Sequence, residues 1–351
     1  MNLKAINLLY FNNKIPFIKI SDEIEERLLR IIDAYLKDNN KNIKIEHMRS
    51  HHTSAVFRVS HRSKNKYNNF YIKMGFETSN ELKEYIYNEY KNTLKAFNIF
   101  ENKKYMGATK PIDSFYDEAA FIAEELPGTR MDYALRKTLK FVKGDNGIEI
   151  ANNWCRSCAD WILTFQEKFP HEVDYLTVAD MENKIDWQLK KLECLDYNLN
   201  SDLIKKLKYI TNEILMGFDK KDFLKKPKHN DFAPWNIIVC GSSINVLDFA
   251  DIQDDSMHYD IFYFTDSLKF LKRKNFIKDS SIAYLQKNML QHYSPGLTKE
   301  HKSYLYFKIL FLLIRMNAIL IKSKYKQIVN AIVKNDLKKC YFELDEIVNQ
   351  L

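Results

Sequence analysis

The chain has 351 residues, 46% of them hydrophobic and 28% charged, with only 8 glycines. This excludes a disordered or low-complexity protein and leaves room for about two domains. The net charge of +8 is concentrated in residues 265–351, where 16 Lys and Arg stand against 7 Asp and Glu. This basic region predicts an anionic small molecule or a membrane surface as partner, or is a solvated helix surface. No zinc finger, RNA-binding motif or basic arm points to nucleic acid.

The first third of the chain alternates between helical and extended patterns. Residues 21–38 predict an amphipathic helix, with Asp22 as N-cap because Glu25 follows at the capping-box position; Ser21 is the other candidate. Period-two alternation predicts strands at 42–48, 55–61 and 69–75, then a helix at 79–98 capped by Ser79, then two strands in 109–126 around a turn at Tyr116–Glu118.

Pro127 and Gly128 mark a change of pattern, because the sequence beyond them is mostly helical. The exception is residues 237–247, where two strand-like runs flank Gly241-Ser242-Ser243 and predict a hairpin. We therefore expect an α+β protein with two lobes around a cleft. The small N-terminal lobe, residues 1–125, would hold an antiparallel sheet with helices, and the larger C-terminal lobe, residues 126–351, would be mainly helical.

Several features weigh against secretion and membrane insertion. The start of the chain lacks an uninterrupted apolar stretch and a small-residue cleavage site. The most apolar segment, residues 304–321, is interrupted by two basic residues and an asparagine, and predicts a buried helix. The five cysteines are expected to be reduced thiols, with Cys155 and Cys158 on one helix face rather than in a zinc site. We expect a cytoplasmic protein.

The most informative stretch is HNDFAPWNIIV, residues 229–239, which is followed by LDFAD. It holds Asp231 and, five residues later, Asn236, and the predicted hairpin brings Asn236 close to Asp248. A carboxylate with an amide oxygen suits a hard cation such as Mg²⁺, which keeps waters and shares phosphate oxygens with a nucleotide. Asp231 is then left to orient and deprotonate a hydroxyl, as phosphoryl transfer requires.

This ordered set resembles the HGDxxxxN loop and the Asp-aromatic metal-binding step of the aminoglycoside phosphotransferase and choline kinase family of small-molecule kinases. The resemblance covers roughly residues 49–264. It implies a protein-kinase-like fold and transfer of the γ-phosphate of ATP to a hydroxyl. It also implies that Asp231 is the catalytic base, that Asn236 and Asp248 bind Mg²⁺, and that His229 and Asp260 support the loop.

The resemblance further implies nucleotide contacts in the N-terminal third. Lys73, in NFYIKM, would bind nucleotide phosphates and pair with a helix glutamate, for which Glu89 is the best match and Glu84 the alternative. Backbone groups from Glu124 to Leu126, in EELPG, would meet the adenine.

Two positions depart from the family pattern. Asn230 stands where the family often has glycine, and asparagine tolerates a positive φ better than most residues. The phosphate-covering loop RSHHTSAVFRV holds no glycine. Thr53 and Ser54 would therefore have to offer hydroxyls and amides to phosphate, with His51 and His52 beside them.

Only 11 residues separate Asp248 from Asp260, fewer than the activation segment of a protein kinase spans, so a small-molecule acceptor is favoured. The basic C-terminal region favours a sugar or an anionic glycan intermediate. Asp251, Asp254 and Asp255 would instead favour a cationic acceptor, such as an aminoglycoside or a choline-like amino alcohol. A non-catalytic nucleotide-binding regulator is the remaining alternative, although it has no need of the base and the metal ligands together.

Overall fold

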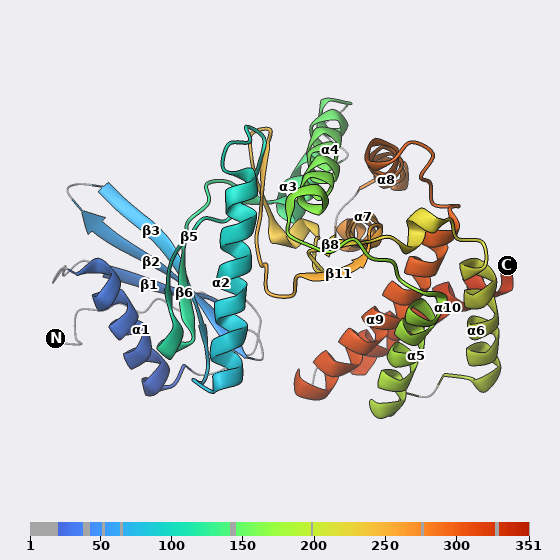
Figure 1. Cartoon of the computed structure of the whole chain (residues 1–351), viewed down its shortest axis with the longest axis horizontal. Coiled ribbons are helices and arrows are strands. Elements are labelled where there is room, and N and C mark those ends of the chain that lie inside the picture. The colour runs from blue at the N-terminus through green and yellow to red at the C-terminus, as the bar shows by residue number, and fades with distance from the viewer. Residues whose placement is uncertain are drawn as a thin grey trace. The chain divides into compact units, whose positions relative to one another are not determined.

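The computed structural model describes residues 20–37, 43–50, 53–63, 66–140, 145–197, 199–274, 277–326 and 330–350. The chain forms two compact units, the first comprising Met1–Thr129 and Asn236–Ile252 and the second comprising Arg130–Trp235 and Gln253–Leu351. Figure 1 labels the helices and many of the strands along the chain. His51 and His52 lie outside the described residues, as do the side chains of residues 272–274.

The first unit is built on a five-stranded antiparallel sheet of order β1-β2-β3-β6-β5. Its strands are β1 (Ile43–Ser50), β2 (Ser54–Ser63), β3 (Lys66–Gly75), β5 (Pro111–Phe115) and β6 (Ala120–Glu124). The 3-10 turn η2 (Tyr116–Glu118) joins the last two strands. Each of these strands was predicted from its alternating pattern, and the predictions are confirmed.

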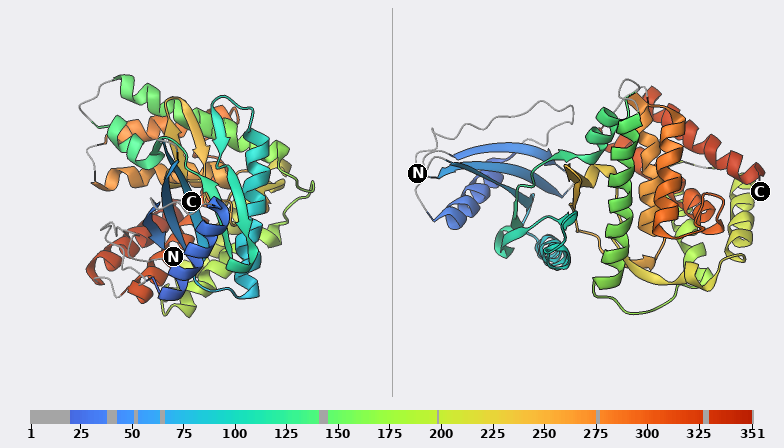
Figure 2. Two further views of the ribbon diagram at one scale, coloured as in Figure 1. Left: turned by 90° about the vertical axis from the view of Figure 1, so that its left-hand side faces the viewer. Right: turned by 90° about the horizontal axis from the view of Figure 1, so that it is seen from above.

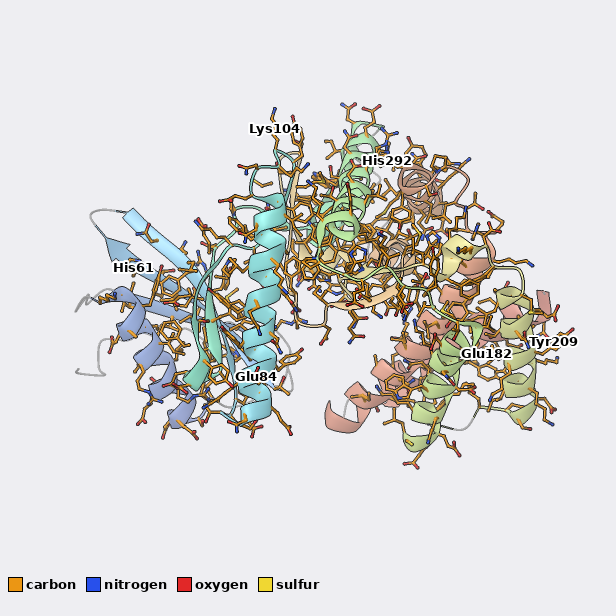
Figure 3. All side chains as sticks on the ribbon, in the orientation of Figure 1. His61, Glu84, Lys104, Glu182, Tyr209 and His292 are labelled. Atoms are coloured by element: carbon orange, nitrogen blue, oxygen red, sulfur yellow. The ribbon has the colours of Figure 1, made fainter. Side chains whose placement is uncertain are left out.

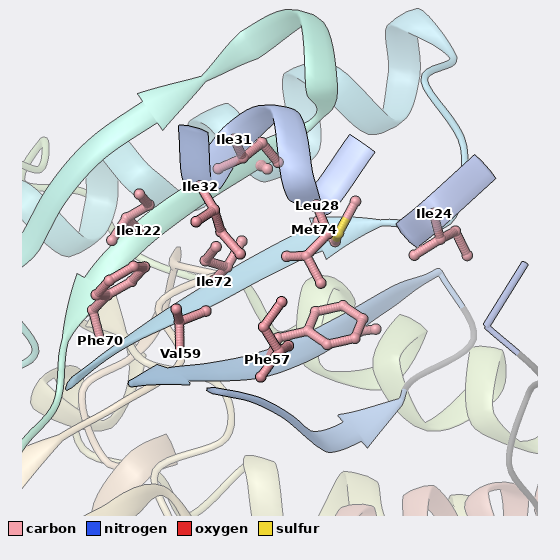
Figure 4. Close-up of a cluster of buried hydrophobic side chains, with 13 residues drawn as sticks. Ile24, Leu28, Ile31, Ile32, Phe57, Val59, Phe70, Ile72, Met74 and Ile122 are labelled. Carbon is pink, nitrogen blue, oxygen red and sulfur yellow. The ribbon is translucent and has the colours of Figure 1, made fainter. Parts of the chain in front are cut away.

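Helix α1 (Asp22–Leu36) covers one face of this sheet. Ile24, Leu28, Ile31 and Ile32 recur along one side of the helix and are buried against alternate residues of β2, β3 and β6 (Figure 4). The N-cap prediction was wrong, because Ser21 rather than Asp22 caps the helix: its side chain accepts a hydrogen bond from the Ile24 amide.

Helix α2 (Asn80–Phe100) packs on the opposite face. Phe121 and Ala123 of β6 pack with Leu82 and Ile86 of α2, whereas Ile122, between them, packs with α1. Ser79 precedes the helix as predicted, but its side chain makes no capping hydrogen bond; its hydroxyl donates to Glu77 instead.

A second, smaller sheet has the order β4-β10-β9-β7. Its strands are β4 (Met106–Ala108), β7 (Thr129–Arg130), β9 (Ile237–Cys240) and β10 (Ser243–Val246). The predicted hairpin is therefore confirmed, and β10 also pairs with β4 in parallel. Gly128 has a φ of +129°, and a Cβ there would lie 2.3 Å from the Val239 carbonyl oxygen, so the turn before β7 needs glycine.

The second unit is mainly helical, as Figure 2 shows from two further directions, and its elements confirm the predicted α+β class. Its helices are α3 (Met131–Thr138), α4 (Asp145–Lys168), α5 (Val178–Cys194), α6 (Ser201–Leu215), α7 (Tyr259–Ser267), α8 (Asp279–Tyr293), α9 (Lys302–Lys326) and α10 (Asn330–Gln350), with 3-10 turns η4 (Lys220–Phe223), η5 (Pro234–Asn236) and η6 (Leu268–Lys274). A two-stranded ribbon of β8 (Lys225–Lys228) and β11 (Gln253–Ser256), which the sequence pattern did not indicate, lies among them.

The apolar segment 304–321 falls within α9 and is a helix, as predicted. Among the described residues, α9 is the one helix long and apolar enough to cross a membrane. Of its apolar stretch, Lys302–Ile321, 56% is buried inside the structure. Its aromatic side chains pack on α7, where the rings of Phe307 and Phe311 meet Tyr259 edge-on. On α4, burial raises the pKa of the Cys155 thiol to about 12, and Cys158 is buried beside it, so both behave as core residues.

The two compact units differ from the sequence-based division in two segments. That division placed a single boundary at residues 125/126, whereas residues 126–129 and 236–252 group with the first unit. As a nucleotide-binding lobe (1–125) and a catalytic, acceptor-binding lobe (126–351), the division stays a prediction.

Candidate functional site

Lys73 lies in β3 with its ammonium held between two carboxylates. The Lys73 Nζ atom is 2.7 Å from Glu89 Oε1 on α2 and 3.2 Å from Asp248 Oδ1, which follows β10. All three residues belong to the first unit. The structure therefore brings together a lysine, a helix glutamate and the predicted metal ligand, which are far apart in the sequence.

This group is largely shielded from water, since the Lys73 and Glu89 side chains are 15% and 2% exposed. Burial raises the pKa of Glu89 to about 7, because the charged form loses its hydration and Asp248 adds a second negative charge nearby. Burial alone would lower the pKa of Lys73, but the two carboxylates outweigh it and raise that pKa. Lys73 is therefore a fixed positive charge at neutral pH.

Glu84, the alternative partner of Lys73, is engaged elsewhere. It lies on α2 (Figure 3), and its carboxylate accepts a hydrogen bond from the Tyr116 hydroxyl at 2.6 Å. Glu84 and Glu89 are five residues apart on one helix, so they point in different directions. Lys73 therefore pairs with Glu89 and not with Glu84, and the role of the pair in nucleotide binding stays a prediction.

The hairpin of β9 and β10 places Asn236 next to the segment that carries Asp248. The Asn236 carbonyl accepts a hydrogen bond from the Leu247 amide at 2.9 Å, one residue before Asp248. Asn236 is 2% exposed, whereas the Asp248 side chain is 28% exposed. Asp248 has a φ of +68°, a conformation that aspartate tolerates better than most residues.

In the second unit, Asp260 of α7 holds the loop that carries Asp231. Its carboxylate accepts hydrogen bonds from the backbone amides of His229 at 2.6 Å and Asn230 at 3.1 Å. Burial raises the pKa of Asp260 to about 7, although the two amide donors act in the opposite direction. Asn230 has a φ of +72°, which confirms the expectation that this position needs a residue tolerant of positive φ.

The rest of the loop is anchored by packing. The His229 ring lies edge-on to Trp161 and Phe232, and Phe232 is fully buried against Trp161 and Phe264. His229 is thus a core residue of the second unit, and the scaffolding role expected for it stays a prediction.

Two aromatic side chains hold the Asp231 carboxylate. The Tyr263 hydroxyl donates to Asp231 Oδ1 at 3.1 Å, and Trp235 Nε1 lies 3.3 Å from both carboxylate oxygens. Burial, together with the Asp231 carboxylate, raises the pKa of Tyr263 well above its usual value, so its hydroxyl remains a donor. Sequence reasoning missed both residues. The available signal was spacing, because Tyr263 lies one helical turn beyond Asp260.

The remaining predicted nucleotide contacts are all in the first unit. Thr53 is exposed and Ser54 is buried, so Thr53 is the more accessible hydroxyl. The Glu124 amide donates to the Lys110 carbonyl at 2.9 Å, and the Leu126 side chain is half-buried. Their roles stay predictions.

The three aspartates considered for a cationic acceptor differ in their surroundings. Asp255 is buried and forms ion pairs with Lys184 and Lys228, so it adds no net negative charge. Asp251 and Asp254 are exposed, and the Tyr85 hydroxyl lies 3.4 Å from Asp251. Of the three aspartates, only Asp251 and Asp254 therefore present a carboxylate to solvent.

No protein-family model matches the sequence, and neither does any curated protein sequence. Solved structures do match. The aminoglycoside phosphotransferase APH(4)-Ia is 10% identical with a TM-score of 0.58, over 93% of this chain and 98% of that one. A choline kinase from Cryptosporidium parvum is 13% identical with a TM-score of 0.57, over 93% and 97%. A choline/ethanolamine kinase family protein from Mesorhizobium loti is 11% identical with a TM-score of 0.54, over 87% and 91%. The chain therefore has the protein-kinase-like fold of these small-molecule kinases, as the motifs predicted.

Proposed function

We propose that this protein is a phosphotransferase that moves the γ-phosphate of ATP to a hydroxyl of a small molecule. The observation that carries the proposal is the Lys73 ammonium held by Glu89 and Asp248, beside the hairpin of β9 and β10 that follows Asn236. A fixed cation next to an accessible carboxylate is what a nucleotide triphosphate with its metal requires. Other proteins of this fold have been solved with ADP, GDP and AMP-PNP.

In this proposal Asp231 is the general base. It accepts the proton of the acceptor hydroxyl while the hydroxyl oxygen bonds to the γ-phosphorus and the bond from that phosphorus to the ADP leaving oxygen breaks. Trp235 and Tyr263 orient the carboxylate, and Asp260 keeps the loop backbone in place. Lys73 binds nucleotide phosphates, Thr53 and Ser54 lie at the phosphate end, and Glu124 to Leu126 meet the base.

Asn236 and Asp248 would hold Mg²⁺. Among the described residues there is no group of three or more His, Cys, Asp or Glu that could hold a metal. One carboxylate and one carboxamide are too few for a zinc or calcium site, but they fit Mg²⁺, which keeps waters and takes phosphate oxygens as further ligands. When bound, the cation would neutralise phosphate charge.

For the acceptor, we propose a sugar or a glycan intermediate that carries negative charge. The support is the net charge of +9 in residues 265–351. The same positive charge would attract a negatively charged membrane surface. An aminoglycoside or amino-alcohol acceptor is the second candidate. It is favoured by the fold, since an APH(2'') enzyme of this fold was solved with GDP and kanamycin, and by the two exposed carboxylates of Asp251 and Asp254.

Titration calorimetry with ATP, in Mg²⁺ and in chelator, tests the nucleotide site. We expect the wild type to bind ATP far more tightly with Mg²⁺, and Asp248→Ala to lose this dependence. Equal wild-type affinities in the two buffers would refute the metal assignment.

A transfer assay then identifies the acceptor. It offers radiolabelled ATP with neutral sugars, anionic glycan precursors, amino alcohols and aminoglycosides. Tight MgATP binding without transfer to any of these would favour a regulator that binds nucleotide without catalysis. We expect the activity in the cytoplasm.

A further inference from the structure

Two lysines and one aspartate form a cluster in the second unit. Lys228 of β8 and Asp255 of β11 lie on neighbouring antiparallel strands, and Lys184 of α5 reaches the same carboxylate; Figure 1 labels the three elements. The Lys228 Nζ atom is 2.6 Å from Asp255 Oδ2, and the Lys184 ammonium donates to Asp255 Oδ1. Within the cluster, one carboxylate is therefore shared by two ammonium groups.

Of the two lysines, Lys184 has its charge less well balanced. The Lys228 ammonium also lies over the Tyr259 ring, 3.9 Å from its centroid, and so gains an aromatic face beside the carboxylate. Burial lowers the pKa of Lys184, and the attraction of Asp255 does not restore it, in part because the Lys228 charge acts against it. The Lys184 ammonium is therefore short of negative charge.

Other carboxylates near the cluster do not remove this shortage. Asp180 lies on α5 four residues before Lys184 and attracts it, but its Oδ2 atom accepts from the Thr177 amide and hydroxyl and caps the helix instead. Asp260 is attracted by Lys228, but burial raises the pKa of Asp260 to about 7, so it is only partly charged at neutral pH.

Lys184 is also the member of the cluster that solvent reaches most easily. Its side chain is 27% exposed, against 9% for Lys228 and 6% for Asp255. An ammonium has three N–H donors, and in the described part of the chain Lys184 uses one of them, on Asp255. An anion that approaches from solvent would therefore meet a cation with donors to offer.

The cluster lies close to the proposed base. Lys228 precedes Asp231 by three residues, so their Cα atoms are at most roughly 11 Å apart. The Tyr259 ring below the Lys228 ammonium stacks on Tyr263 at 6.1 Å, and the Tyr263 hydroxyl donates to Asp231. Burial raises the pKa of Tyr259, and the charges of Asp255 and Asp231 raise it further, so both carboxylates are near one ring. One small acceptor could reach the cluster and the base together.

We propose that Lys184 binds a phosphate or carboxylate group of the acceptor whose hydroxyl is placed at Asp231, and that it thereby selects acidic acceptors. The inference rests on the proposed function and gives the negative charge of the acceptor a binding residue outside the basic region 265–351. The bound anion supplies the negative charge that Lys184 otherwise shares with Lys228. A cationic acceptor is repelled at the same place.

Inorganic phosphate and acetate are the probes of this site. Each is titrated by calorimetry at constant ionic strength into protein saturated with MgAMP-PNP, so that the proposed nucleotide site is filled. We expect the wild type to bind at least one anion with a dissociation constant of roughly 1 mM, and Lys184→Gln to weaken that binding by roughly tenfold or more. The anion that binds more tightly identifies the acidic group.

Two further variants separate the charge of Lys184 from its structural role. Lys184→Arg keeps the positive charge and should keep the anion affinity. Lys190→Gln removes an exposed lysine from the same helix, is the matched control, and should bind both anions like the wild type. A lysine with a structural role alone would, when changed to glutamine, lower the melting temperature and leave the anion affinity unchanged.

Kinetics with the acceptor found in the transfer assay give a second readout. Lys184→Gln should raise the KM of that acceptor by roughly tenfold or more and leave kcat near the wild-type value. The reason is that the ammonium holds a part of the acceptor that does not react, so its contact is equal before and during phosphate transfer.

Three results would overturn the inference while leaving the proposed function intact. One is a wild type that binds MgAMP-PNP but neither anion, a measurement that needs no variant to fold. The second is equal anion affinity in the wild type and Lys184→Gln, and the third is transfer to a neutral or cationic acceptor with an unchanged KM in that variant. A wild type that does not bind MgAMP-PNP would overturn the proposed function and the inference together.

Discussion

Asp231 is the residue on which the proposed chemistry depends most directly. Its carboxylate lies in a loop whose backbone is held by Asp260, and its two oxygens face the donors of Trp235 and Tyr263. We predict that Asp231→Asn lowers kcat by roughly 10²–10⁴-fold, the usual contribution of a general base. Nucleotide affinity should stay near the wild-type value, because only the acceptor hydroxyl needs the base. Steady-state rates and ATP calorimetry measure the two effects, and near-normal turnover would remove Asp231 from this role.

The hydrogen bond from Tyr263 should set the pH range of activity. A donor to a carboxylate favours its charged form, so losing the donor makes the carboxylate easier to protonate. We predict that Tyr263→Phe moves the acid limb of the kcat profile to higher pH by roughly half to one unit. The phenyl ring should keep the contact with Phe311, whose ring centroid lies 5.2 Å away. A variant with lower stability and an unmoved profile would show that Tyr263 is only structural.

The site residues that could be predicted from the sequence are those whose side-chain chemistry and spacing together form a motif. Asp231, Asn236 and Asp248 stand out because their spacing matches a loop and a hairpin. Tyr263 offered only its spacing, one helical turn beyond Asp260, and Trp235 offered no pattern, since aromatic residues are common in helices and cores. The ion pair between Arg58 of β2 and Glu125, whose Nε and Oε1 atoms are 2.6 Å apart, likewise depends on strand register, which was not predicted.

Helix α1 is fastened to the sheet by a buried arginine. Arg27 is 2% exposed and donates to the Gly75 carbonyl at 3.0 Å, to the Glu118 carboxylate at 3.3 Å and to the Glu118 carbonyl. We predict that Arg27→Met lowers the free energy of unfolding by roughly 1–3 kcal/mol, because the carbonyls of Gly75 and Glu118 lose their buried donor, while the Glu118 carboxylate keeps Arg30. Arg30→Met is the matched control. Arg30 bonds the same carboxylate from an exposed position, so its loss should hardly move the urea midpoint.

His258, at the start of α7, should make the fold sensitive to mild acid. Burial lowers its pKa, although the Asp222 carboxylate, 3.2 Å from Nε2, acts in the opposite direction. In the unfolded chain the imidazole protonates near pH 6.5, while in the folded protein it stays neutral to lower pH. Stability from this group is therefore present above pH 6.5 and is lost as the pH falls, by at most about 1.4 kcal/mol per pH unit. Urea unfolding between pH 7.5 and 5 should show a flatter profile for His258→Gln than for the wild type.

Elements with a strong period were predicted well, and short ones were not. Strands β1, β2 and β3 and helices α1 and α2 each bury one face. Their apolar and polar residues therefore alternate with a regular period in the sequence. The ribbon of β8 and β11 has four residues in each strand and is rich in charges, KKPK against QDDS, so it carries no apolar alternation. Asp255 of β11 forms ion pairs with Lys228 of β8 and with Lys184 of α5, which only the folded chain brings together.

For the molecule as a whole, the uneven charge gives a prediction about the acceptor. In the second unit some of the basic residues are already paired, since Lys269 bonds Asp266 and Glu343. If the unpaired charge of residues 265–351 attracts an anionic acceptor, changing Lys272, Arg273 and Lys274 to glutamine should raise the acceptor KM and spare ATP binding. Screening acts over roughly 8–10 Å at physiological salt, so the difference should shrink as salt rises. Unchanged constants at every salt concentration would favour a neutral or cationic acceptor, and Asp251 and Asp254 would be the next residues to test.

The return of residues 236–252 to the first unit bears on how the protein folds during synthesis. Strand β4 pairs with β10, so residues 109–242 must be translated before Met106–Ala108 finds its neighbour. At ~5–20 residues per second this takes roughly 7–30 s. Throughout that interval the newly made β4 shows open N–H and C=O groups, which are a template for pairing with another nascent chain. Closely spaced ribosomes on one messenger RNA, or slow codons within residues 109–242, would therefore favour aggregation of the nascent chain. In the folded protein β10 covers this edge of β4.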